Sequence, residues 1–109
     1  DQLARKACLE GLDAGIDTRL SFDERVFFYL PMEHSETMAD QLRCVELFNS
    51  LLDWAPPALQ ADAKYYLDFA ERHKAIVERF GRYPHRNEIL GRSSTPEELA
   101  FLEEPGSSF

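Results

Sequence analysis

The sequence predicts an all-α protein, built as an antiparallel stack of about five helices. Apolar residues recur at helical spacing, strong capping sequences separate these stretches, and no segment alternates between apolar and polar residues as a strand does. The 109 residues suit a single domain, which we place at residues 1–104, followed by a flexible tail at residues 105–109.

The first two helices are marked by their ends. Apolar residues within residues 2–14 share one helical face, and Gly15 follows where a helix takes a left-handed terminating residue. Ser21 and Glu24 have the spacing of a capping box, in which each side chain satisfies the other residue's free backbone N–H. A second helix should therefore begin directly after Ser21.

The middle of the chain continues this pattern. The second helix is apolar almost all round over residues 26–30, so we expect it to be buried and to end at Pro31. Ser35 is the expected N-cap of a third helix over residues 36–54, which carries apolar residues at helical spacing. Ala, Pro and Pro at positions 55–57 then break the chain.

The last two predicted helices are one long helix and one short, well-capped helix. A helix over about residues 58–80 should end at Gly81, and its apolar face contains His73. Thr, Pro, Glu and Glu at positions 95–98 supply an N-cap, a proline in the first turn and a capping-box glutamate. These signals predict a short final helix.

Composition argues against several classes of function. The net charge of −8 argues against a general nucleic-acid binder, which needs cations to displace counterions from phosphates. No apolar run approaches the roughly 18 residues of a membrane span, so we expect no membrane partner. Cys8 and Cys44 lie on apolar helix faces without a Cys-x-x-Cys motif, which predicts buried free thiols and a cytoplasmic location.

The charge is uneven along the chain. Between Arg72 and Arg92, six basic residues face two acidic ones, a net charge of +4, so the rest of the chain carries −12. A cationic region on an acidic body attracts a small anion or an acidic peptide. Its arginines can equally pair with the protein's own carboxylates.

Residues 80–92 are the most informative segment. Two glycines and a proline fix the backbone path, so the polar side chains between them point in set directions. Arginine beside asparagine suits a carboxylate or a phosphate, although the same residues can hold one loop against another. Together with the long helix, the segment supplies the expected ligand-binding residues, which are His73, Arg82, His85, Arg86, Asn87 and Arg92.

Three histidines allow a catalytic alternative. With His34 or His85 as the acid/base and Glu33 as its orienting carboxylate, the chain would be a small hydrolase or lyase. The structural alternatives are a local capping role for His34 and a hydrogen-bonded core position for His73. Nothing in the spacing requires the histidines to converge on a metal ion, so we expect no metal site and no cofactor.

Three motifs resemble those of a known family. They lie at residues 28–36 (FYLPMEHSE), 80–87 (FGRYPHRN) and 89–98 (ILGRSSTPEE), and they resemble the bacterial domain-of-unknown-function family 924 along the whole chain. The resemblance implies helix hairpins stacked in an arrangement similar to tetratricopeptide repeats. It implies no activity.

The chain departs from that family in one respect. Members usually carry a further N-terminal portion with a Leu-Asp-Gln-Phe-Pro-Arg-Asn motif, so we expect Asp1 to begin a C-terminal portion. A face that the missing helices would cover is then exposed, paired in a homo-oligomer or covered by a separate fragment. Three functions stay open: a binding module for a small anion or acidic peptide, a hydrolase or lyase, and a purely structural stack that docks a partner.

Overall fold

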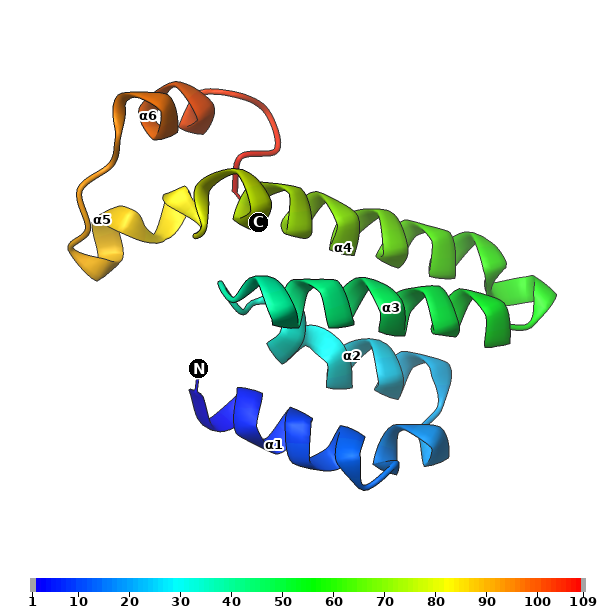
Figure 1. The fold of residues 1–109 in the computed structure, drawn as a ribbon. Helices are drawn as coiled ribbons and strands as arrows, with labels where there is room; N and C mark the ends of the chain where they lie inside the picture. Colours follow the sequence, from blue (N-terminus) through cyan, green and yellow to red (C-terminus); the bar gives the residue numbers. More distant parts are fainter. Residues whose placement is uncertain (1, 109) are drawn as a thin grey trace.

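The computed structural model describes residues 2–108, and this part of the chain is all-helical, as predicted (Figure 1). Asp1, where we expect a C-terminal portion to begin, and Phe109, the last residue of the predicted tail, lie outside the described residues. Within this range there are six α-helices and three short 3-10 helices. The α-helices are α1 (Gln2–Asp13), α2 (Phe22–Glu33), α3 (Met38–Trp54), α4 (Gln60–Phe80), α5 (Asn87–Leu90) and α6 (Pro96–Leu102). The 3-10 helices are η1 (Ile16–Arg19), η2 (Pro57–Leu59) and η3 (Pro84–Arg86).

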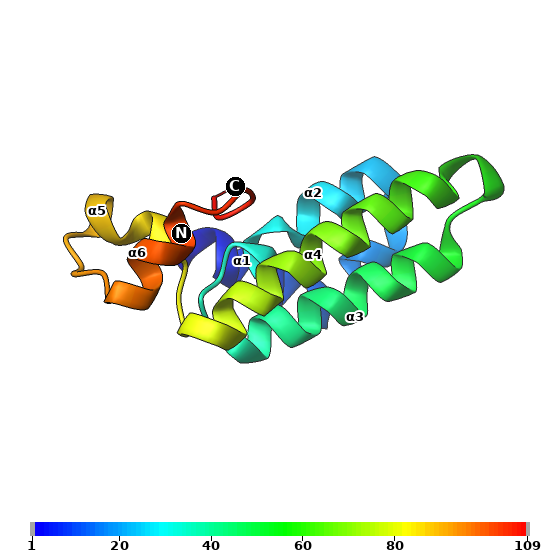
Figure 2. The same ribbon diagram turned by 90° about the horizontal axis from the view of Figure 1, so that it is seen from above.

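Successive helices from α1 to α4 run antiparallel to one another, so α2 and α4 point in the same direction (Figure 1). Viewed from above, α3 and α4 lie side by side along their length, and α2 contacts both of them (Figure 2). The short α5 and α6 lie beyond the C-terminal end of α4. The helix α4 ends at the same end of the stack as α2, where α3 begins, so the segment that follows α4 also lies at this end.

The main core fills the space among the first four helices. Its fully or nearly fully buried residues include Tyr29, Met32, Phe48 and Leu51. A smaller cluster joins the end of α4 to α6, and its buried members are Ile76, Val77 and Tyr83. Burying each large apolar side chain contributes roughly 1.5–3 kcal/mol, so these contacts supply most of the stability of the stack.

Both cysteines are buried free thiols, as predicted from their helical positions. Cys8 of α1 lies against α2, where its Sγ donates to the carbonyl oxygen of Phe28 at 3.2 Å. Cys44 of α3 has no exposed surface. The two thiols therefore report on different parts of the core, one at an outer helix and one at the centre.

The helix ends explain how the chain reaches this arrangement. Gly81 and Gly91 both have left-handed backbone angles, with φ of +71° and +68°, and they end α4 and α5. A side chain is strained in this conformation, which is why glycine stands at both corners. The capping boxes of Ser21 with Glu24 and of Thr95 with Glu98 are present as predicted.

Three predicted helix details are wrong. Pro31 does not end α2, because the last turn is held by the backbone N–H of His34, which donates to Leu30 at 2.9 Å. The side chain of Phe27 is 76% exposed, so α2 is not buried all round. The third helix begins at Met38 rather than residue 36, and its N-cap is Thr37 rather than Ser35, whose hydroxyl donates to Asp40 and accepts from the backbone N–H of Thr37.

None of the described helices is both long enough and apolar enough to cross a membrane. The flexibility expected of residues 105–109 stays a prediction. In the structure Ser107 is buried, and its hydroxyl donates to the carbonyl of Leu102 at 3.1 Å.

The Thr95→Ala variant should lower the free energy of unfolding by about 1 kcal/mol, because the Thr95 hydroxyl accepts a bond from the backbone of Glu98. Urea denaturation followed by circular dichroism measures this change. Thr37→Ala is the matched control, since Thr37 stands at the N-cap of α3 without a side-chain capping bond. Equal losses in the two variants would contradict the assignment of the α6 cap.

Candidate functional site

A cavity of about 600 Å³ lies between α2 and α4, beside the segment that follows Gly81. This volume falls in the range of small-molecule sites, about 300–1,000 Å³. The residues that line it are Val26, Leu30, Glu33, His34, Phe48, Tyr65, Tyr66, Phe69, His73, Tyr83, His85 and Arg86.

The parallel course of α2 and α4 divides the cavity into an apolar end and a polar end. Along α2 the lining runs from Val26 to Glu33, and along α4 it runs from Tyr65 to His73. The two helices run in the same direction (Figure 1). The apolar residues come first on both helices and the ionisable residues come last. Because α2 and α4 run in the same direction, the polar groups of both helices lie at one end of the cavity, beside residues 81–92.

A continuous row of rings forms one wall. Ring centroids are 5.8 Å apart between Tyr65 and Phe69, and 5.1 Å apart between Phe69 and His73. The row continues from His73 to Tyr83 and from Tyr83 to His85, at 5.7 Å in each case. Such spacings are typical of favourable aromatic contacts, and the rings are tilted or edge-on to one another rather than coplanar.

Glu33 and His73 meet at the polar end. Both side chains are almost fully buried, and Glu33 Oε1 lies 3.9 Å from His73 Nδ1. That nitrogen donates to the carbonyl oxygen of Phe69 at 2.7 Å, because a carbonyl can only accept. Burial lowers the pKa of His73 to about 4, so the ring is neutral at neutral pH.

The Glu33 carboxyl has no cationic partner among the described residues. Burial raises its pKa to about 7, and no nearby charge offsets this effect. A buried carboxyl in this condition exchanges a proton near neutral pH. Groups with such shifted pKa values concentrate at functional sites, although structural networks produce them too.

His34 and His85 complete the polar end. Burial, and then the charge of Arg86, lower the pKa of both imidazoles. The Nδ1 atom of His85 is buried and makes no hydrogen bond to the described residues. A ligand with a hydrogen-bonding group could satisfy this nitrogen.

Arg86 is held by two contacts with neutral groups. Its Nη1 donates to the carbonyl of His34 at 2.9 Å, and its guanidinium lies 4.6 Å from the ring centroid of Tyr83. No carboxylate among the described residues pairs with it. The guanidinium therefore stands at the polar end of the cavity as an available cation.

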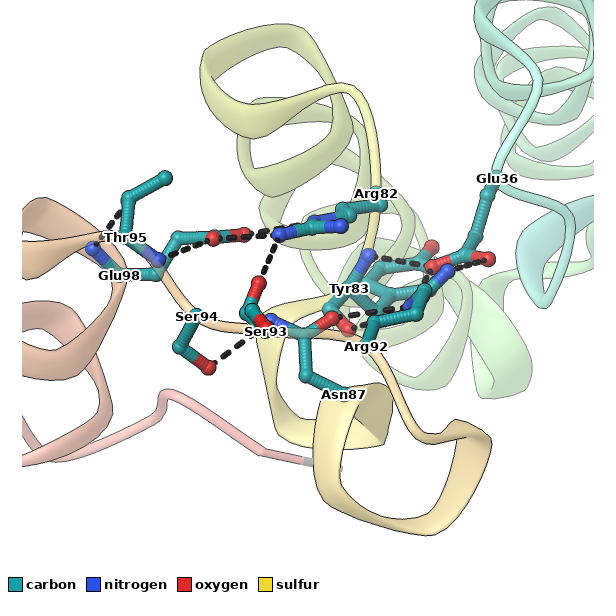
Figure 3. A network of polar contacts seen from close by, with 9 residues as sticks. All are labelled: Glu36, Arg82, Tyr83, Asn87, Arg92, Ser93, Ser94, Thr95 and Glu98. Carbon is teal, nitrogen blue, oxygen red and sulfur yellow. Dashed lines mark hydrogen bonds and ion pairs between the residues drawn. The ribbon is translucent and has the colours of Figure 1, made fainter.

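Arg82 serves a different purpose (Figure 3). It holds both carboxylate oxygens of the buried Glu98, at 2.9 and 2.7 Å, and also donates to the carbonyl of Ser93. The hydrogen bonds from Arg82 lower the pKa of Glu98 to about 2. This two-point bond fastens α6 to the start of the 81–92 segment.

Arg92 makes the equivalent bond on the other side (Figure 3). Its two terminal nitrogens each lie 3.0 Å from an oxygen of Glu36, and it also donates to the carbonyl of Tyr83. Burial alone would raise the pKa of Glu36, but the bonds from Arg92 and from the Tyr83 backbone lower it overall. The buried Asn87 accepts a bond from Arg92 and donates to Ser94.

The structure thus separates the six residues expected to bind a ligand. His73, His85 and Arg86 line the cavity, whereas Arg82, Asn87 and Arg92 bond the protein's own groups. Of the catalytic candidates, His34, His85 and Glu33 all line the cavity. The carboxyl of Glu33, however, approaches His73 rather than either of the other two histidines.

Sequence reasoning missed several residues that shape the site. Tyr65 precedes His73 at helical spacing, and the four-residue steps from Tyr65 to Phe69 to His73 were a usable signal. Tyr83 is buried and gave no such signal, because its partners lie far away in the sequence. Its hydroxyl donates to the carbonyl of Glu33 at 2.5 Å and accepts from Gln41 at 2.7 Å.

Across residues 2–108, no group of three or more histidine, cysteine, aspartate or glutamate side chains is arranged to hold a metal ion. The side chains that line the cavity offer several kinds of chemistry. These can bind an anion, exchange a proton at Glu33 and pack an apolar ligand body.

Comparison with known proteins places the chain beside proteins of unknown function. A family model described as "Bacterial protein of unknown function (DUF924)" matches residues 1–106. A solved structure of a protein of unknown function, ATU0120 from Agrobacterium tumefaciens, is 46% identical and superposes with a TM-score of 0.78. The match covers 94% of this chain and 52% of that one, so this chain spans about half the length of its relative. No curated protein matches the sequence.

The Glu33→Gln variant should be less sensitive to pH than the wild type. The pKa of Glu33 is about 7 in the folded chain, against about 4.3 in an unfolded one, so folding disfavours its ionised form. The contribution of Glu33 to the stability of the fold is complete below about pH 4, where this carboxyl is protonated, and is lost as the pH rises to about 7. Relative to the variant, the wild type should lose roughly 3 kcal/mol of unfolding free energy over this range.

Urea denaturation at intervals between about pH 4 and pH 8 measures this difference, because contributions from other groups cancel between the two proteins. Glu88→Gln, at an exposed position, is the control and should parallel the wild type. Parallel curves for Glu33→Gln would contradict the uncompensated burial of Glu33.

Proposed function

The chain belongs to DUF924, a family of bacterial proteins of unknown function, and we infer its activity from its own side chains. We propose that it binds a small molecule with an apolar body and an anionic group. The cavity between α2 and α4 is the binding site, and Arg86 holds the anionic group. The observation that supports this most is an arginine without a carboxylate partner, among the described residues, at the polar end of an apolar-walled cavity.

Two contributions make such binding favourable. A guanidinium and a carboxylate form a charge-assisted, two-point hydrogen bond, which is stronger than a bond between neutral groups. The ligand body adds the burial of apolar surface against Tyr65, Tyr66 and Phe69, at roughly 25 cal/mol per Å². The rigid ring wall limits the entropy that binding would otherwise cost.

An acidic peptide is the other ligand that the cationic segment suggested. It would need several cations in a row to hold successive carboxylates. Arg82 and Arg92 are already paired with Glu98 and Glu36, which leaves Arg86 as the cation of this segment that faces the cavity. One available charge favours a small ligand with one anionic group.

The Arg86→Ala variant should bind an aromatic carboxylate at least about tenfold more weakly than the wild type, because it removes the charge-assisted bond. The probe is 3-phenylpropanoate at about pH 6, where Glu33 is mainly uncharged. Isothermal titration calorimetry measures the affinity. Inorganic phosphate and a tetraglutamate peptide are compared with it, and both should bind more weakly, since neither has an apolar body.

Arg19→Ala is the matched control. It removes the same charge from an exposed position on η1, away from the cavity, and should leave the affinity unchanged. Equal effects of the two variants would reduce the interaction to general charge attraction. Stronger binding of tetraglutamate than of 3-phenylpropanoate would favour the peptide instead.

A hydrolase or lyase is the second candidate, and the Glu33 carboxyl supports it. A group with a pKa of about 7 inside a cavity can donate or accept a proton at neutral pH. Glu33 would then be the acid/base itself rather than an orienting group for His34 or His85. Turnover of small esters that disappears in Glu33→Gln, without loss of folding, would establish it, and turnover that survives would remove it.

A further inference from the structure

The cavity contains two groups of opposite charge that the protein leaves without ionic partners. The guanidinium of Arg86 bonds a backbone carbonyl and a ring face, and the carboxyl of Glu33 meets only a neutral histidine among the described residues. The other two arginines of the 81–92 segment each have a carboxylate at 3.0 Å or less. The contrast singles out Arg86 and Glu33.

The two residues that carry these groups both line the cavity and both contact Tyr83. The Tyr83 hydroxyl donates to the backbone carbonyl of Glu33 at 2.5 Å, while the Arg86 guanidinium lies over the Tyr83 ring at 4.6 Å. The ring of His73 contacts both Tyr83 and the Glu33 side chain. Arg86 and Glu33 thus line one cavity, yet they form no ion pair with each other.

A buried carboxyl without a partner is unstable as an anion, because it has lost its hydration without gaining a compensating charge. The protein either keeps it protonated or meets it with a cation from outside. A ligand that brings an ammonium group would remove this cost and gain an ion pair in a site of low dielectric constant. Glu33 therefore favours a ligand that carries a cationic group.

We propose that the cavity recognises an aromatic α-amino acid, which carries a carboxylate, an ammonium group and an apolar ring on one small framework. The carboxylate binds Arg86, the ammonium group binds Glu33, and the side chain packs on the ring wall of Tyr65 and Phe69. This assignment rests on the proposed function and specifies the class of its ligand.

Three matched probes test the assignment. L-Phenylalanine carries all three groups, 3-phenylpropanoate lacks the ammonium group, and phenethylamine lacks the carboxylate. Titration calorimetry at about pH 8, above the pKa of Glu33, should show phenylalanine binding at least about tenfold more tightly than either of the others. The comparison uses only the wild-type protein, so it does not depend on how well a variant folds.

Two variants then assign each group. Glu33→Gln should abolish the advantage of phenylalanine over 3-phenylpropanoate, and Arg86→Ala should abolish its advantage over phenethylamine. Circular dichroism of each variant verifies folding before the titrations are compared. A preference for phenylalanine that survives Glu33→Gln would overturn the assigned role of Glu33.

The outcomes separate this inference from the proposed function. If 3-phenylpropanoate binds as tightly as phenylalanine, the amino-acid assignment is overturned while binding of an anionic ligand stands. If neither compound binds at about pH 6 or at about pH 8, the proposed function fails and this inference fails with it.

Discussion

The arrangement of the site depends on the burial of Tyr83 at the end of the helical stack. Its backbone N–H donates to the Glu36 carboxylate at 2.6 Å, its hydroxyl donates to the backbone carbonyl of Glu33, and Gln41 donates to the same hydroxyl. These bonds join residues more than forty positions apart and fix the segment after α4 against the ends of α2 and α3. Every cavity residue from this segment takes its position from that anchor.

The three arginines of the segment show how similar side chains divide between architecture and recognition. Arg82 and Arg92 each form a two-point bond to a carboxylate, and these bonds hold α6 and the connection between α2 and α3 in place. Arg86 lies between them in sequence but bonds only neutral groups of the described chain. Two of these three arginines therefore reinforce the fold, and the third, Arg86, lies beside the cavity without a carboxylate partner among the described residues.

Local signals in the sequence predicted much of the fold. The capping boxes at Ser21 and Thr95 and the glycine corners are properties of a few adjacent residues, so they could be read directly. The gathering of His73, His85 and Arg86 followed from a long helix and a constrained segment after it. The partners of the arginines could not be predicted, because Glu36 lies 56 residues from Arg92 and an acidic chain offers many alternatives.

The same limit applies to Glu33 and to the exposure of Phe27. Which carboxylate loses its hydration depends on how α2 and α4 pack, and no short-range pattern records that packing. The face of α2 that carries Phe27 is apolar in sequence, yet the fold leaves this side chain in solvent. Such features are decided by tertiary contacts rather than by helical periodicity.

The two buried thiols allow conformational opening of the protein to be followed by chemical labelling. An alkylating reagent reaches Cys8 when α1 separates from α2, but it reaches Cys44 only when the centre of the core opens. Labelling rates at the two positions would therefore distinguish detachment of the outer helix from cooperative unfolding. A ligand seated between α2 and α4 would slow the second process far more than the first.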